Sequence, residues 1–558
     1  MFNDKRYTFF RLPNNACNNI NTIELKAKEN MPIENFNLVN DAWLPVTTQE
    51  GNSKTVGLKE IFSTAHAIKG LNLEFGIQEP AILRMLIACA YRILGGPNKD
   101  EEWKAIWRRK FLPEDKINEY FERWSCKFEL FSEKAPFFQL ANLEPENENL
   151  WKPATELVLH APAGNNIPLF MPVSKDGTLL PAEAALWLIV RHAWGTTADK
   201  SGAKSDPKVK KGKASPSTGI LGRIGFVAPI GKNFFETLLL NLIPLNENEQ
   251  YIANSTTEGD CPVWEAESQN ERKNQKPNGI CELLTWQGRR IRLVAGEKNG
   301  ETIVAKVFIS AGDDIPKLND IKSIEPHTSW RRNKNNNLEF HPFRPVTGQQ
   351  IWRGLSAILA LGDTKQRASC LSFVSKLKDE DEKDEIKLES LLVSSAQYGS
   401  MNSVMEDILI ERLDVPIAVL RTSDLEAAQV AESAVKLVDD VAKAIGDVAE
   451  LLVYSNKNSV SKVPNSFKKD AKRARSVLEE EVFAIFDQPF RALLRGLSEV
   501  FDLMSLKRSW RDKVETELRS IVEREMSRLL PNQMPVGVYA ENMFYKKLSE
   551  ALNHFYQE

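Results

Sequence analysis

The feature that most restricts the fold is a long run of apolar residues at helical spacing in the last quarter of the chain. These residues recur at alternating steps of four and three: Val430, Ala434, Leu437, Val441, Ala444, Val448 and Leu451. A second row at steps of seven broadens the apolar face: Val438, Ile445 and Leu452. A helix with such a face normally buries it against other helices. The pattern therefore predicts a helical bundle after about residue 416.

Three further helices are expected downstream of this one. A turn rich in Ser and Asn, 455–461, ends the first helix, and Ser466 is the candidate N-cap of the second. The apolar positions of the second helix are Val477, Val482, Phe483, Ile485, Phe486, Phe490, Leu493 and Leu494. A third helix is expected over about 506–530 and a fourth over about 539–556. Four helices joined by short turns predict an antiparallel four-helix bundle over residues 416–558.

Upstream of the bundle, the patterns of helices and strands are mixed. Residues 80–94 are nearly all apolar on one side, which predicts a buried helix. Residues 36–46, 283–293 and 302–309 are predicted strands. The first two-thirds of the chain is therefore expected to combine α and β structure.

The length of the chain indicates more than one domain. At 558 residues it is too long for a single ordinary core, and roughly three to four domain-sized units are expected. Residues 1–30 are polar and weakly patterned, so they are interpreted as an extension outside the main fold. Residues 31–415 are assigned to a large mixed α/β domain and 416–558 to the helical bundle. The predicted fold class is α+β, with a mixed N-terminal domain followed by an antiparallel C-terminal four-helix bundle.

The composition and motifs favour a binding protein over an enzyme. The sequence contains no GxxxxGK[ST], HExxH or GxSxG motif, and no GxGxxG motif after a predicted strand. The six cysteines are scattered without CxxC spacing, so neither a metal site nor a disulfide framework is predicted. No segment resembles a signal peptide or is long and apolar enough to span a bilayer, so we expect a cytoplasmic protein without a membrane partner. No cofactor is predicted.

A lysine-dense loop is the first indication of a nucleic-acid partner. Its lysines lie among Gly, Ala, Ser and Pro: Lys200, Lys204, Lys208, Lys210, Lys211 and Lys213. Because such a segment has almost no apolar residue to bury, we expect a mobile, positively charged loop, which suits a polyanion. The net charge of −3 means that any affinity for nucleic acid must come from local patches of this kind. A surface insertion with no binding role is the alternative.

Three other polar loops share this character. They are 164–170, 329–337 and 396–402. The second places Arg331 and Arg332 beside Trp330, an aromatic residue that could stack on a base. Each loop taken alone is an ordinary turn, but loops that combine Arg or Lys with Asn and Gly are typical of phosphate and minor-groove contacts.

Four segments resemble the large subunit (CasA) of Cascade, the type I-E CRISPR surveillance complex. They are NLVNDAWLPV near the start, GNNIPLF at 164–170, FFETLLLNLIP at 234–244 and LLTWQGRRIRLV at 283–294. Their order and spacing hold from about residue 36 to the C-terminus. The resemblance implies a non-catalytic subunit that recognises the short PAM duplex beside the target and helps to open it, while a guide RNA reads the sequence. It also implies three partners: the guide RNA-containing Cascade subunits, double-stranded target DNA, and a helicase–nuclease effector.

The resemblance further implies which residues contact DNA at the PAM. The glycine-rich loop that probes the minor groove corresponds to Lys211, Gly212, Lys213, Ser215, Ser217 and Gly219. Ala, Ser and Pro lie between the two glycines, which departs from the family pattern. The minor-groove lysine corresponds to Lys334.

A wedge and a docking loop complete the implied sites. The wedge that separates the first base pairs corresponds to 400–402, with Met401 as an apolar wedge and Asn402 bonding an exposed base edge. A loop expected to dock at the 5′ end of the guide against a neighbouring subunit contains Gly164, Asn165, Asn166 and Phe170. Some relatives hold a zinc ion, but Cys261 and Cys281 alone cannot, so no metal is expected here. A purely architectural subunit and a hydrolase with an unrecognised site are the alternatives.

Overall fold

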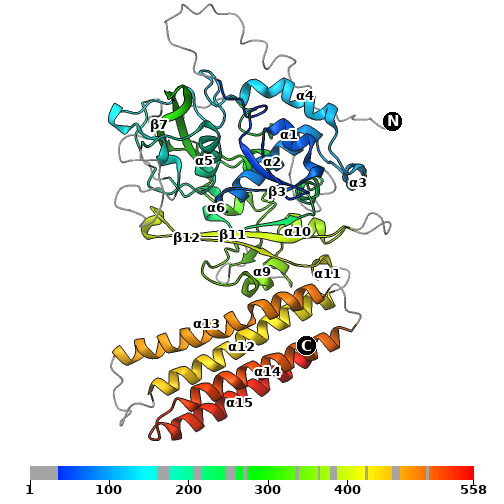
Figure 1. Ribbon diagram of the computed structural model, residues 1–558, viewed down its shortest axis with the longest axis vertical. Helices are drawn as coiled ribbons and strands as arrows, with labels where there is room; N and C mark the ends of the chain where they lie inside the picture. Colours follow the sequence, from blue (N-terminus) through cyan, green and yellow to red (C-terminus); the bar gives the residue numbers. More distant parts are fainter. Residues whose placement is uncertain are drawn as a thin grey trace, which may run out of the picture. The chain divides into compact units, whose positions relative to one another are not determined.

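The computed structural model describes most of the chain. The described residues are 35–159, 176–199, 201–204, 206, 216–245, 259–267, 273–333, 339–361, 365–377, 386–421, 425–454, 465–497 and 502–557. Within these ranges α-helices are combined with β-strands (Figure 1), which confirms the predicted mixture of α and β structure. The predicted extension 1–30 lies outside the described residues. No helix that the structure describes is long and apolar enough to span a membrane.

The residue contacts divide the chain into two compact units, and each unit combines separate stretches of sequence. Unit 1 contains the described residues up to Arg223, together with Asn233–Glu325 and Ala396–Glu406. Unit 2 contains Ile224–Lys232, Pro326–Ser395 and the described residues from Asp407 onwards. The predicted limits 31–415 and 416–558 stay a prediction.

The first half of unit 1 is built on a small sheet and a buried helix. Strands β1 (Leu44–Thr48), β2 (Ser53–Val56) and β3 (Ile68–Leu71) form an antiparallel sheet in the order β2-β1-β3. Helix α2 (Gln78–Leu94) is buried along nearly its whole length, as the apolar pattern of 80–94 predicts. The short helices near it are α1 (Leu58–Ser63), α3 (Asp100–Arg109) and α4 (Glu114–Trp124).

The second half of unit 1 contains the long hairpin of β6 (Arg289–Lys298) and β7 (Glu301–Ala311). These strands pair antiparallel, and the two-residue strand β4 (Lys152–Pro153) pairs with β7. The helices of this half are α5 (Pro181–Trp194), α6 (Ile220–Arg223), α7 (Phe234–Asn241) and α8 (Ile280–Leu284).

Two predicted strands are only partly correct. The predicted strand 283–293 begins six residues late, at Arg289, because Leu283 and Leu284 bury their side chains from helix α8. The predicted strand 36–46 is regular only from Leu44, while Asn37 makes an isolated bridge to Glu129.

Unit 2 begins with strands from distant parts of the sequence. Strand β5 (Phe226–Ile230) pairs antiparallel with the first residues of β11 (Ser390–Tyr398), and β11 is followed along the chain by β12 (Met405–Leu413). A second small sheet has the order β10-β8-β9. Its strands are β8 (Trp330–Arg332), β9 (Phe340–Pro342) and β10 (Lys365–Gln366), and the short helices of this region are η8 (Ile351–Gly354), α9 (Leu355–Leu359), α10 (Ser369–Val374) and α11 (Ile417–Leu420).

The C-terminal part of unit 2 consists of long helices, drawn from yellow to red in Figure 1. They are α12 (Glu426–Tyr454), α13 (Asn465–Gly496), α14 (Leu503–Ser527) and α15 (Met534–Gln557), and α12 packs against the other three. The predicted apolar rows of α12 are buried as far as Val448, whereas Leu451 and Leu452 are half-buried. On α13 the prediction for Val477 is wrong, because its side chain is 59% exposed and Leu478 is buried in its place.

Candidate nucleic-acid interface

The predicted wedge lies at the turn between β11 and β12, which we call the hairpin tip (Gly399–Val404). The chain reverses through a short 3₁₀ turn at Ser400–Asn402. Within the tip, the Gly399 N–H donates to the Val404 carbonyl at 2.9 Å, and the Asn402 N–H donates back to the Gly399 carbonyl at 2.9 Å. The Ser403 hydroxyl donates to the Ser400 carbonyl at 2.9 Å. These bonds make the tip a closed, internally bonded turn.

Two neighbouring residues of the hairpin tip have left-handed backbone conformations. Met401 has φ 53° and ψ 21°, and Asn402 has φ 56°. For a residue with a side chain this region costs roughly 1–2 kcal/mol, and Asn tolerates it better than most. The Met401 side chain is 83% exposed, the largest value among the exposed large hydrophobic residues of the described chain. An exposed apolar side chain on a strained backbone is typical of a contact site.

The hairpin tip is held by the segment that follows helix α5, which we call the α5 loop (Gly195–Asp199). Thr197 of this loop donates its N–H to the Asn402 carbonyl at 3.0 Å and its hydroxyl to the Met401 carbonyl at 2.6 Å. At the base of the tip, the Tyr398 hydroxyl donates to the Trp194 carbonyl at 2.7 Å. Three hydrogen bonds therefore join the tip to the end of α5, although more than 200 residues separate the two segments in sequence.

A buried carboxylate fixes the α5 loop itself. Asp199 accepts from Arg191 Nη2 at 2.5 Å and from Arg289 Nε at 2.6 Å, and all three side chains are at least 90% buried. Burial alone would raise the pKa of the Asp199 carboxyl, but the two guanidinium groups outweigh burial and hold its pKa below the usual value. Asp199 is therefore ionised at neutral pH, as the counter-ion of two buried cations.

Arg289 connects this carboxylate to the end of the predicted PAM loop. Its Nη2 donates to the Thr196 carbonyl at 2.5 Å and to the Ser217 carbonyl at 3.1 Å. The α5 loop and the segment at 216–219 therefore share one guanidinium group. The hairpin tip and the end of the predicted PAM loop are both attached to the α5 loop.

Gly219 packs directly against helix α5. Its N–H donates to the Gly195 carbonyl at 2.8 Å, and a Cβ on Gly219 would lie 2.3 Å from the carbonyl oxygen of Ala193. Because this oxygen is a main-chain atom, rotation of a side chain could not relieve such a clash. In this structure Gly219 is buried and supports the loop, and its assignment to DNA contact stays a prediction.

His192 lies one residue beyond Arg191 on α5 and is also buried. Its Nε2 is 2.9 Å from the Phe138 carbonyl, so this nitrogen carries the proton and donates. Burial lowers the pKa of His192 to about 3, so the ring is neutral at physiological pH.

Several of the predicted contact residues fall outside the described residues. These are Lys211, Gly212, Lys213, Ser215, Lys334, Gly164, Asn165, Asn166 and Phe170. Of the predicted contacts that the structure describes, Ser217 and Gly219 lie at the α5 loop, and Met401 and Asn402 form the hairpin tip. The expectation that Trp330 could stack on a base is wrong, because its side chain is only 2% exposed. Arg331 and Arg332 beside it are exposed.

Sequence reasoning missed Thr197 and Asp199. The only local signal was a short polar stretch, GTTAD, directly after an apolar helix. The Met401 carbonyl lies 204 residues after Thr197, and Arg289 lies 90 residues after Asp199, so no local pattern could identify these contacts.

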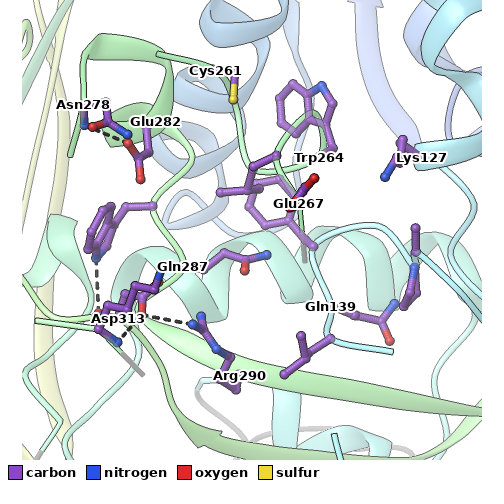
Figure 2. A pocket seen from close by; sticks show the side chains of 18 of the residues that line it. Lys127, Gln139, Cys261, Trp264, Glu267, Asn278, Glu282, Gln287, Arg290 and Asp313 are labelled. Carbon is purple, nitrogen blue, oxygen red and sulfur yellow. Dashed lines mark hydrogen bonds and ion pairs between the residues drawn. The ribbon is translucent and has the colours of Figure 1, made fainter. Parts of the chain in front are cut away.

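Unit 1 also contains a cavity of about 280 Å³, shown in Figure 2. Arg290 pairs with Asp313 at 3.0 Å on one side, and Glu282 accepts from the Asn278 N–H at 2.7 Å on another. None of the predicted contacts that the structure describes lines this cavity. Because its charges are mixed and Arg290 is already neutralised, it is a poor surface for a phosphate backbone.

The cysteines near this cavity are poor metal ligands. Burial raises the pKa of the Cys261 thiol to about 11 and that of Cys281 well above its usual value, so both are protonated at neutral pH. Within the described ranges, no group of three or more His, Cys, Asp or Glu side chains is arranged to hold a metal ion.

The match to a family model defines the class of the chain as the CRISPR-associated proteins. Residues 37–521 match the family model described as CRISPR-associated protein Cse1. This match covers most of the chain, and the chain therefore belongs to the Cse1 family, also called CasA.

Individual relatives agree with this assignment. The CasA/Cse1 protein of Thermus thermophilus is 27% identical over 428 residues, which is 75% of this chain and 78% of the relative. The crystal structure of Cse1 from Acidimicrobium ferrooxidans superposes with a TM-score of 0.84 at 41% identity, covering 94% of this chain and all of that one. A chain of a structure described as a CRISPR RNA-guided surveillance complex shares the fold, with a TM-score of 0.60 at 16% identity over 92% of this chain and 99% of that one.

Proposed function

We propose that this chain is the non-catalytic large subunit of an RNA-guided CRISPR surveillance complex and recognises the PAM in duplex DNA. In this role it helps to open the target duplex and presents a surface to a helicase–nuclease. Its partners are the guide RNA-containing subunits, double-stranded DNA and that effector. Membership of the Cse1 family supports the proposal, as does a structural neighbour that belongs to such a complex.

The observation that carries the DNA-opening part is the geometry of the hairpin tip. Met401 is exposed and has a left-handed backbone conformation, and Thr197 donates hydrogen bonds to the carbonyls of Met401 and Asn402. An apolar side chain fixed in this way can enter a base step, as the apolar wedges of minor-groove proteins do. Asn402, which is also exposed, carries the amide that would bond a freed base edge.

The remaining contacts are proposed from the sequence. Lys211, Gly212, Lys213 and Ser215 form the part of the PAM loop that precedes the anchored residues Ser217 and Gly219, and Lys334 is the minor-groove lysine. The loop of Gly164, Asn165, Asn166 and Phe170 docks at the guide RNA. We also propose that α12–α15 form an antiparallel four-helix bundle that serves as a contact surface for other subunits, with exposed basic residues at Lys468, Lys469, Lys472 and Arg473.

Target binding across a randomised-PAM duplex library tests the proposal, using the reconstituted complex with and without this chain. Binding confined to a few PAM sequences only when the chain is present would support PAM recognition. Binding that is equal without the chain, or indifferent to the PAM, would leave an architectural role. DNA cleavage by the purified chain that depends on a divalent metal would instead favour a hydrolase.

Lysine variants separate DNA contact from assembly. Lys211→Ala combined with Lys213→Ala should leave complex assembly intact but weaken DNA binding, and should reduce the slope of log K against log salt by about 1–2. Lys69→Ala, which removes an exposed lysine of β3, is the matched control and should change neither. Loss of assembly in the double variant would favour the architectural role.

A further inference from the structure

We infer that Thr197 is a positioning residue for the hairpin tip: it holds the backbone of Met401 and Asn402 in the conformation that directs Met401 outward. The inference rests on the proposed function of the tip as a DNA wedge. It assigns a function to a residue of the α5 loop whose N–H and hydroxyl both bond main-chain carbonyls of the tip.

The backbone of the tip needs support from outside the hairpin. Met401 and Asn402 are consecutive, both have side chains, and both have positive φ values. The bonds inside the tip have the carbonyls of Gly399, Ser400 and Val404 as their acceptors. None of them involves the carbonyl groups of residues 401 and 402, which set the direction of the peptide planes on either side of Asn402.

Thr197 supplies the donors for both of these carbonyls. Its N–H bonds one and its hydroxyl bonds the other, at 3.0 Å and 2.6 Å. A single residue therefore fixes two successive peptide planes. With both carbonyls turned towards the α5 loop, the Met401 side chain is left 83% exposed.

The site allows a mild substitution. Thr197 is only half-buried, so removing its hydroxyl leaves no cavity. Thr197→Val preserves the shape and the N–H bond but leaves the Met401 carbonyl without its donor, whereas Thr197→Ser keeps the hydroxyl. Thr197→Ser loses only the methyl group and Thr197→Val loses only the hydroxyl, so the two variants separate the hydrogen bond from the packing of the side chain.

The first measurement does not depend on DNA. Amide hydrogen exchange of the peptide spanning 397–405 should be about threefold to tenfold faster in Thr197→Val than in the wild type, which is the change expected from losing one hydrogen bond. Thr197→Ser should exchange as the wild type does. Equal exchange in all three proteins would overturn the positioning role.

The second measurement follows duplex opening in the complete complex, with 2-aminopurine at the first position beside the PAM. Thr197→Val should reduce opening of a fully paired duplex about threefold to tenfold, while binding to a duplex already mismatched at that position should not change. An equal loss on both substrates would show a general structural defect and would overturn the inference.

Met401→Ala separates this inference from the proposed function. If Met401→Ala opens DNA normally while the tip of Thr197→Val exchanges faster, the wedge function fails and the positioning role stands. If Met401→Ala is defective but Thr197→Val opens DNA as the wild type does, the positioning role fails and the wedge function stands.

Discussion

Asp199→Asn is the substitution that most directly tests how the α5 loop is held. It keeps the size of the side chain but removes the negative charge between Arg191 and Arg289, both of which are buried. Neutralising one partner of a buried ion pair typically destabilises a protein by about 3–5 kcal/mol, because a charge is left buried without compensation.

The structure places the effect at the lower end of this range. Arg289 keeps the bonds from Nη1 and Nη2 to the carbonyls of Gly288, Thr196 and Ser217, so only its Nε depends on the Asp199 side chain. Arg191 depends more than Arg289 does on Asp199 to compensate its buried charge. We therefore expect a loss of about 3 kcal/mol, which corresponds to an unfolding constant of unit 1 about 150-fold larger.

Urea unfolding at pH 7, followed by tryptophan fluorescence, measures this loss. Unit 2 contains Trp330, Trp352 and Trp510, and the other nine of the twelve tryptophans lie in unit 1, so the signal mainly reports unit 1. With a slope of about 2 kcal/mol per molar urea, the midpoint should fall by about 1.5 M. Asp176→Asn, which removes an exposed partner of Lys298, is the control and should cost less than about 0.5 kcal/mol.

The same measurement at low pH checks the electrostatic cause. The folded-state pKa of Asp199 lies below its usual value of 3.8, so its contribution is complete above that pH and is lost as the pH falls through the folded value. The difference between wild type and Asp199→Asn should therefore shrink below about pH 4. A difference under about 1 kcal/mol at pH 7, or one that stays constant at low pH, would refute the reasoning.

Three further predictions follow from buried groups. The folded-state pKa of His192 is about 3, against 6.5 in an exposed ring, so the unfolded chain binds more protons as the pH falls towards 5. The contribution of His192 to stability should therefore fall by about 1.6 kcal/mol between pH 6.5 and 5, and urea titrations of His192→Gln at both pH values should lack this loss. Gly219→Ala should lower stability by about 1–3 kcal/mol in thermal unfolding, because its Cβ would lie 2.3 Å from the carbonyl of Ala193, and an unchanged midpoint would contradict that packing. Phe486→Ala should lower the free energy of unfolding by about 3–5 kcal/mol, because Phe486 is buried, whereas Val477→Ala should lower it by less than about 0.5 kcal/mol. Urea unfolding followed by circular dichroism of the helices measures both losses, and equal losses would place Val477 in the core.

The elements that local periodicity could predict are the long amphipathic helices. The patterns over 80–94 and 430–448 identify α2 and α12 because each helix buries one continuous face. The same reasoning misplaced Val477, since the neighbouring Leu478 lies four residues before Val482 and takes the buried position on that face. Apolar spacing alone does not show which of two adjacent apolar residues points inward.

The candidate site depended on contacts between distant parts of the sequence. The pattern of β6 gave no reason to bury Arg289, because its counter-ion Asp199 lies 90 residues earlier in the chain. The hairpin tip was located through the resemblance to a family, whereas its support by Thr197 involves only backbone acceptors and has no side-chain signature. Composition and the resemblance to a family could therefore suggest the contact residues but could not reveal what holds them.

The way in which Thr197 bonds the hairpin tip has a consequence for how this part of the protein can evolve. Both acceptors are main-chain oxygens, which every amino acid possesses, so the support is indifferent to the side chains at positions 401 and 402. The positive φ values exclude β-branched residues but admit unbranched side chains of many chemistries. Evolution or protein engineering can therefore replace the two exposed residues at positions 401 and 402 without changing the α5 loop that supports them.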